Sequence, residues 1–249
     1  MGREFRPWSV VARNLSEHAD NPIHTDEGAR SAGFGAALVA GTTVHAYLTR
    51  PVVEAWGTGW LAGGTSIVEF LAPVEAGDPV DCIPMPDQNG SVEVRAEVRG
   101  DLRARLVARL GTKFGQAPVV EGDRLDDGPL TPWLERLDGP WTDYAWRAGD
   151  DLDIYADEGL VHPCTWTALA NGVMVRHLVD GSWIHTRSQI IHHTVVPAGA
   201  AALVEARVAD KFETRRGTRA VVDVHISVDG VPVADIVHEA LVSLRPTDL

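Results

Sequence analysis

Residues 38–77, LVAGTTVHAYLTRPVVEAWGTGWLAGGTSIVEFLAPVEAG, decide the fold, because they recur 122 positions later as residues 160–199, LVHPCTWTALANGVMVRHLVDGSWIHTRSQIIHHTVVPAG. The two segments align without a gap, and ten of the forty aligned positions carry the same residue. In the first copy these positions are Leu38, Val39, Thr43, Ala46, Val53, Gly59, Ser66, Val74, Ala76 and Gly77. A repeat of this length indicates two copies of one structural unit.

The first part of each copy predicts a buried helix. In residues 38–56, apolar side chains recur near helical spacing from Val44 to Trp56, and we expect Pro51 to bend or end the helix. In the second copy the same periodicity follows Pro163, which falls near the helix start, where a missing N–H costs nothing.

Strands are predicted after each helix. The segments 65–82 and 187–208 each contain a strand and a glycine turn, and further alternating strands are expected at 91–98, 102–110, 219–228 and 233–244. This order predicts an α+β fold in which each half is a long helix wrapped by a curved antiparallel sheet. We assign the first unit to residues 1–120, a Pro-, Gly- and Asp-rich connection to 121–140 and the second unit to 141–249.

The two halves differ most just before the helix, where residues 18–41 read HADNPIHTDEGARSAGFGAALVAG. A DxNPxH-type loop, an acidic residue, a run of small residues and a glycine entering a buried helix resemble the MaoC-like dehydratases and (R)-specific enoyl-CoA hydratases. The strand and Gly-Asp turn in TSIVEFLAPVEAGDPV resemble the same family. The resemblance covers residues 14–110, reaches the second half only through the repeat, and implies two hotdog folds in tandem, a double hotdog.

The resemblance also implies a chemistry, the addition of water across the C2–C3 bond of an acyl thioester or its removal. His24 would be the base, Asp20 its partner, Asn21 the residue that orders the loop, and Gly41 the helix start that polarises the thioester carbonyl. The family's Asp lies five residues before its His, and that position is Ala19 in this chain.

Three interpretations of this loop stay open. Asp20 and His24 form a working pair, or His24 acts alone or with His18, or the site has no hydratase activity. Without any chemistry, Asn21 and Pro22 would be a turn before a helix capped by Thr25 or Asp26. The corresponding functions are a hydratase or dehydratase, an acyl thioesterase, and a protein that binds an acyl or tailoring intermediate without turning it over.

The second half serves as an internal control. At the offset of 122, Thr142, Trp146 and Pro163 stand where the first half has Asp20, His24 and Gly41. Trp cannot act as a base and Pro has no N–H, so the same step is excluded there. In the related tandem proteins a degenerate half forms a wall of the acyl pocket, which implies one active site per chain, between the halves.

Charge limits the partners. Lys and Arg number 22 against 35 Asp and Glu, so the formal net charge is −13, which disfavours nucleic acid. An anionic ligand such as coenzyme A, or an acyl-carrier protein, needs only a local basic patch. The densest basic cluster contains Arg215, Arg216 and Arg219; it is a candidate phosphate site or, alternatively, a solvated hairpin tip.

Other sequence features predict a cytoplasmic protein without a cofactor. No apolar run is long enough for a membrane span, and no secretory signal precedes residue 20. The ten histidines show no HExxH pattern, and Cys82 and Cys164 form no CxxC, so we expect no metal. His185 and His192 are expected near the interface of the two halves, where a structural role is the commoner one. The halves form a pseudo-dimer, and a homodimer of chains stays open.

Overall fold

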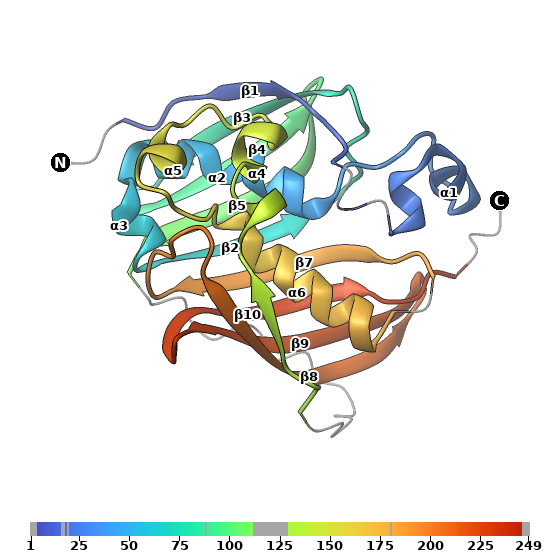
Figure 1. Cartoon of the computed structure of the whole chain (residues 1–249). Helices are drawn as coiled ribbons and strands as arrows, with labels where there is room; N and C mark the ends of the chain where they lie inside the picture. The colour runs from blue at the N-terminus through green and yellow to red at the C-terminus, as the bar shows by residue number, and fades with distance from the viewer. Residues whose placement is uncertain are drawn as a thin grey trace.

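One continuous antiparallel sheet organises the computed structural model, which describes residues 4–15, 18, 20–87, 89–111, 129–179 and 181–245. Within these residues, ten strands follow the order β1-β3-β4-β5-β2-β7-β10-β9-β8-β6 (Figure 1). Their bounds are β1 (Trp8–Val11), β2 (Gly64–Phe70), β3 (Pro79–Pro86), β4 (Ser91–Val98), β5 (Asp101–Leu110), β6 (Trp133–Arg136), β7 (Ile184–His192), β8 (Ala201–Thr214), β9 (Gly217–Val228) and β10 (Val231–Leu241). The sheet curves around two long helices, α2 (Gly41–Trp56) and α6 (Cys164–His177).

The two halves are related by an approximate twofold axis. Strands β2 and β7 pair antiparallel at the middle of the sheet, with Ile67 opposite Gln189, which lie 122 positions apart. Helices α2 and α6 meet through His45 Nδ1 and Thr167 Oγ1, 3.2 Å apart and again at the offset of 122. The gapless repeat therefore corresponds to a structural duplication, and the predicted α+β architecture is confirmed.

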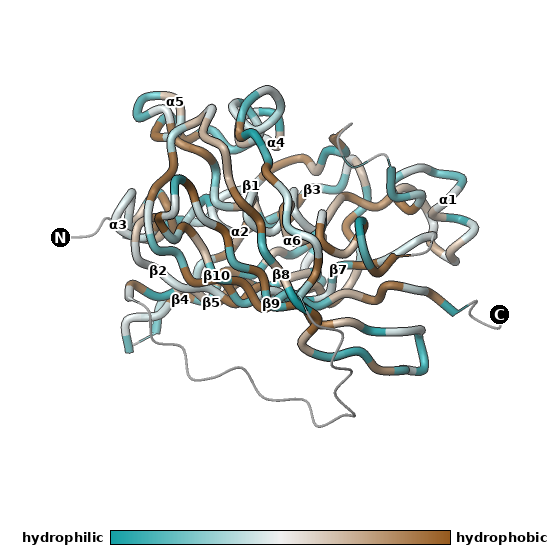
Figure 2. Tube along the Cα trace, turned by 60° about the horizontal axis from the view of Figure 1, so that its bottom comes forward, coloured by the Kyte–Doolittle hydropathy of each residue, from teal (hydrophilic) through white to brown (hydrophobic). Residues whose placement is uncertain are grey.

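The short helices of the first half are η2 (Pro22–His24), α1 (Asp26–Ser31) and α3 (Thr58–Leu61). In the second half they are η3 (Gly139–Trp141), α4 (Tyr144–Ala148) and α5 (Ile154–Asp157). The segment before each long helix is thus helical but differs in detail, as the divergent sequences predict. Hydrophobic stretches run along the strands, whereas hydrophilic residues are frequent at the periphery around α1, α4 and α5 (Figure 2).

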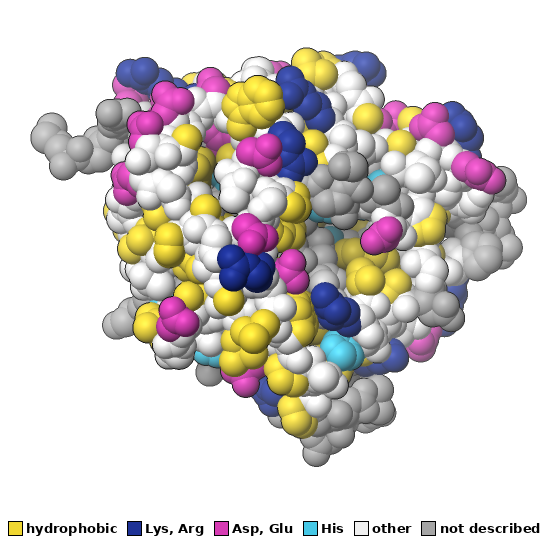
Figure 3. Space-filling view, in the orientation of Figure 1, with side chains coloured by type: hydrophobic (Ala, Val, Ile, Leu, Met, Phe, Trp, Pro, Cys, Tyr) yellow, Lys and Arg dark blue, Asp and Glu magenta, His cyan; other side chains and the backbone are white. Residues whose placement is uncertain are grey.

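Two edge strands were not predicted. Strand β1 pairs with β3, and β6, which lies inside the proposed connection 121–140, pairs with β8 at the opposite edge. Residues 112–128 lie outside the described part of the chain. Over the described ranges, no helix combines the length and the apolar character that crossing a bilayer requires. On the surface, hydrophobic side chains border a hollow right of the centre, near α1 (Figure 3).

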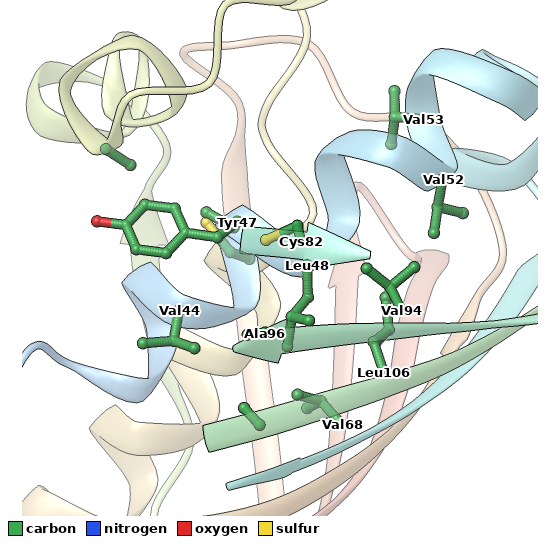
Figure 4. Close-up of a cluster of buried hydrophobic side chains, with 14 of the residues drawn as sticks. Val44, Tyr47, Leu48, Val52, Val53, Val68, Cys82, Val94, Ala96 and Leu106 are labelled. Atoms are coloured by element: carbon green, nitrogen blue, oxygen red, sulfur yellow. The ribbon is translucent and has the colours of Figure 1, made fainter. Parts of the chain in front are cut away.

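The first-half core shows why α2 forms. Val44, Leu48 and Val52 follow one another along one face of the helix and belong to one buried cluster with Val94 and Leu106 of the sheet (Figure 4). All five side chains are buried, and each contributes about 1.5–3 kcal/mol on leaving water. This packing also offsets the disruption by the internal proline, so α2 continues past Pro51 and ends at Trp56.

The second-half core is separate and forms around α6. Trp166, Leu169 and Val173 of the helix lie in one cluster with Ile190 and Ile236 of the sheet. Pro163 is the N-cap of α6, as its position in the sequence predicts. The cluster around α2 also includes Tyr144, Tyr155 and Cys164 of the second half, so the boundary between the halves is partly apolar beside the cleft described next.

Candidate functional site

A cleft of about 1550 Å³ opens between the two halves. Its walls come from the loop residues before and after α1, from the end of α6, from β7 and from the β8–β9 hairpin. The lining includes every residue that the sequence analysis singled out for the site: His18, Asp20, Asn21, His24, Gly41, Arg215, Arg216 and Arg219. Tertiary structure therefore brings the candidate catalytic loop and the candidate phosphate-binding arginines to one cavity.

Asn21 connects the candidate catalytic loop to the other half. Its Nδ2 donates to the carbonyl of Trp183 at 3.0 Å, and its Oδ1 accepts from the N–H of Ile23, which caps η2. The hydroxyl of Thr25 then accepts from the N–H of Gly28 at 3.1 Å and caps α1. These cap contacts restrain the backbone between Asn21 and Gly28.

His24 is held in a defined tautomer. Its Nδ1 lies 2.7 Å from the carbonyl oxygen of Leu38, which can only accept, so Nδ1 carries the proton and Nε2 keeps its lone pair. Burial lowers the pKa of His24 below its ordinary value, and the Leu38 carbonyl opposes this shift only in part. At neutral pH the imidazole is therefore uncharged, with Nε2 able to accept a proton.

The two candidate partners of His24 differ in their surroundings. His18 Nε2 lies 2.8 Å from the hydroxyl of Tyr144, which also lies 2.9 Å from Thr43 Oγ1, and the His18 and His24 ring centroids are 6.0 Å apart. Asp20 is exposed on the cleft, and within the described residues no hydrogen bond joins it to His24. Ala19, where the resemblance expects an acid, lies outside the described residues.

Tyr144 does not line the cleft but contacts His18, which does, and sequence reasoning missed it. It is buried, belongs to α4 of the second half and reaches residues that precede it by 101 and 126 positions. A tyrosine in a short helix carries no local sign of such a contact, so only the packing of the two halves could reveal it.

Gly41 begins α2 at the inner part of the cleft. The N-cap residue, Ala40, makes no side-chain hydrogen bond to the helix, and the first N–H groups of an α-helix have no partner within it. A Cβ atom on Gly41 would lie 3.0 Å from His185 Nδ1 and 3.4 Å from Phe70 Cζ. Glycine therefore lets His185 and Phe70 approach the helix start, which lines the cleft with the positive end of the helix dipole.

Arginines surround the outer part of the cleft. Arg215 and Arg216 are exposed in the β8–β9 turn, whereas Arg219 is half-buried with its Nη1 3.0 Å from Glu239. Arg187 and Arg245, from β7 and from the chain after β10, line the same cleft. These last two were missed because they are isolated in the sequence and converge only in the fold.

In the described part of the second half, side chains fill the start of α6. Asp150, His162 and Cys164 occupy it as a buried chain, with His162 Nε2 3.3 Å from Asp150 Oδ2 and His162 Nδ1 2.9 Å from Cys164 Sγ. Trp146, which replaces His24, points to solvent with 74% of its surface exposed. None of these four residues lines the large cleft.

No protein-family model matches the sequence, and no curated protein matches it either. Solved structures do match over nearly the full length. Rv0216 of Mycobacterium tuberculosis, a conserved protein with a double hotdog fold, has 13% identity and a TM-score of 0.63 over 96% of both chains. A protein of Chloroflexus aurantiacus assigned as a MaoC-domain dehydratase has 13% identity and a TM-score of 0.61, over 98% of this chain and 96% of that one.

A protein of Lactobacillus plantarum assigned as an oleoyl thioesterase has 9% identity and a TM-score of 0.56 over 97% of both chains. At these identities the similarity shows the fold alone, and that fold is the predicted double hotdog. Both dehydratases and thioesterases occur among the similar structures, so the activity has to be argued from the site.

Proposed function

We propose that this protein is a hydratase or dehydratase acting on an enoyl or 3-hydroxyacyl thioester of coenzyme A or a carrier protein. The observation that carries the proposal is the state of His24, an uncharged imidazole whose Nδ1 is bound by Leu38 and whose Nε2 is left as a base. It lines the same cleft as the open start of α2. A general base and an oxyanion site are the two elements that hydration of an enoyl thioester needs.

In the hydration direction, His24 Nε2 takes a proton from a water whose oxygen bonds to C3. The electron pair of the C2–C3 double bond moves toward the thioester, whose oxygen becomes negative. The N–H groups at the start of α2 stabilise this enolate, and the proton held by His24 passes to C2. Asp20, on the same cleft, would hold the water beside His24.

The arginines fit the charged end of such a substrate. Coenzyme A carries several phosphate charges, and Arg215, Arg216 and Arg219 lie on the same cleft as His24. Guanidinium groups bind phosphate through paired hydrogen bonds, which accounts for a basic patch in a chain of net charge −13. The patch explains how an acidic protein would bind an anionic ligand.

The first experiment compares His24→Ala with the native protein on crotonyl-CoA, following loss of the enoyl absorbance. We expect the native protein to hydrate the substrate and His24→Ala to lose about 10²-fold or more of the rate. The matched control is His193→Ala, since His193 is half-exposed, bonds Asp235 and does not line the cleft. Equal rates in native protein and His24→Ala would refute the assignment.

Thioester hydrolysis is the second candidate, favoured by the absence of a hydrogen bond between Asp20 and His24 in the described residues. A water activated by His24 alone could attack the carbonyl carbon instead of C3, and the thiol of coenzyme A would then leave. A thiol reagent in the same reaction mixture separates the two activities, because hydration releases no thiol. Tight binding without either product would identify a protein that binds the acyl group only.

A further inference from the structure

His185 is a buried histidine of the second half that reaches the first-half site. It lies on β7, has only 6% of its surface exposed and lines the same cleft as His24. Its ring centroid is 4.6 Å from that of Phe70, and its Nδ1 is the atom nearest to where a Cβ of Gly41 would be. His185 therefore stands directly beside the start of α2.

The two ring nitrogens of His185 have different environments. Nε2 lies 2.8 Å from Ser188 Oγ, which in turn lies 2.8 Å from His238 Nδ1, and both partners are fully buried. Nδ1 has no hydrogen-bond partner among the described residues although it is buried. A buried polar atom without a partner is costly, and in a binding cleft it points to a ligand that supplies the missing contact.

The hydrogen-bond chain favours one tautomer. The single Ser188 proton goes either to His185 Nε2 or to His238 Nδ1, and the unpaired N–H is then on His185 Nδ1 or on His238 Nε2, respectively. His238 Nε2 is also without a partner among the described residues, and His238 does not line the cleft. Buried N–H groups without partners are rarer than unpaired acceptors, so we assign the N–H to His185, which lines the cleft, rather than to His238.

His185 is also uncharged. Burial and the neighbouring His238 hold its pKa well below the ordinary value. The backbone of Arg187, which favours the protonated ring, raises the pKa only in part. A neutral imidazole donates a hydrogen bond in a fixed direction and adds no charge to the site. The first half has no equivalent, because Gly63 stands at the corresponding position and Ser66, the counterpart of Ser188, has no partner in the described residues.

We propose that His185 Nδ1–H donates a hydrogen bond to the thioester carbonyl oxygen, beside the first N–H groups of α2. Ser188 and His238 are positioning residues that set the tautomer of His185. The inference rests on the proposed substrate class, an acyl thioester, and not on the proposed reaction. The proposed active site thus combines a base from the first half with an oxyanion donor from the second.

The test compares binding of butyryl-CoA with binding of S-butyl-CoA, a thioether that lacks only the carbonyl oxygen. Butyryl-CoA has no double bond to hydrate, so the measurement does not depend on hydratase activity. We expect the native protein to prefer the thioester, and His185→Phe to reduce the ratio of the two Kd values about 3- to 10-fold. His192→Phe is the control, because His192 is equally buried on β7 but lies outside the cleft.

A ratio that stays within twofold in His185→Phe overturns the proposal, as does a native protein without any preference for the thioester. A reduced ratio in a protein that never hydrates crotonyl-CoA supports the role of His185 and refutes only the hydratase assignment. If hydration occurs, His185→Phe should lower kcat by roughly 10²-fold, the effect of removing one oxyanion donor.

Nitrogen-15 NMR of the native protein keeps the proposal testable even if His185→Phe does not fold. We expect His185 to be protonated at Nδ1, and Ser188→Ala to change that tautomer equilibrium while His192 keeps its signals. Protonation of His185 at Nε2 in the native protein would overturn the proposal, since Nδ1 would then have no proton to donate.

Discussion

Replacing Gly41 by Ala places one methyl group at the inner part of the cleft. The new Cβ would lie 3.0 Å from His185 Nδ1 and 3.4 Å from Phe70 Cζ, so these rings must move by a few tenths of an ångström. Overpacking of this kind costs about 1–3 kcal/mol, and Ala in place of Gly recovers about 0.4–1 kcal/mol of chain entropy. We expect the free energy of unfolding to fall by about 2.6 kcal/mol at most.

The effect of Gly41→Ala on activity should be much larger than its effect on stability. The methyl group occupies space beside the helix start where the thioester oxygen would lie, and a displacement of about 1 Å at a reacting group costs roughly 10²-fold in rate. Urea unfolding and hydration of crotonyl-CoA measure the two effects separately. Gly59→Ala is the matched control, because a Cβ there meets nothing within 4 Å.

The result that would refute this reasoning is a Gly41→Ala protein with a kcat within twofold of the native value. Such a protein would show that no substrate atom approaches the start of α2, and the oxyanion role of the helix would be wrong. A loss of activity accompanied by unfolding at 25 °C would contradict the stability estimate instead, since the expected change is small against the about 5–15 kcal/mol of an ordinary domain.

Three further predictions concern the base, the basic patch and the loop. Because the pKa of His24 is lowered, its neutral form persists below pH about 6.5; kcat/KM should stay constant from neutral pH downward and decrease only as the pH falls through that lowered pKa. Replacing Arg215, Arg216 and Arg219 by Ala should raise KM for crotonyl-CoA about tenfold, and less at high salt. The KM for an N-acetylcysteamine thioester, which lacks the phosphates, should not change. An equal rise in KM for both substrates would exclude phosphate binding. Ala19→Asp should increase hydration if the loop is otherwise competent, and an unchanged rate would favour the binding-only alternative.

Local pattern was sufficient for most of the secondary structure. The helices α2 and α6 and the strands within the repeat follow from apolar spacing that is visible in short windows, such as Val44 to Trp56. The end of α2 did not follow from local pattern, because proline usually interrupts a helix. The helix continues past Pro51 because its residues are buried against β4 and β5. The edge strands β1 and β6 were missed since each has only four residues.

The candidate loop was also visible in the sequence, but its hydrogen-bond partners were not. The letters from His18 to His24 suggested a base and a partner, whereas the proton on His24 Nδ1 is set by the carbonyl of Leu38. The hydroxyl beside His18 comes from Tyr144, 126 positions away, and the anchor of Asn21 comes from Trp183, 162 positions away. Such contacts leave no periodic signal, because each is one residue meeting another across the interface of the halves.

The sequence by itself determined the duplication, the identity of the two buried helices and the restriction of the candidate loop to one half. These follow from short-range periodicity and from a repeat at constant offset, which need no knowledge of how the strands pair. Only the tertiary structure decided that His24, His185 and the arginines line one cleft, because strand β7 must pair with β2 before residues of the second half face the start of α2. That pairing places His185 of β7 beside the start of α2, and the proposed chemistry depends on this contact.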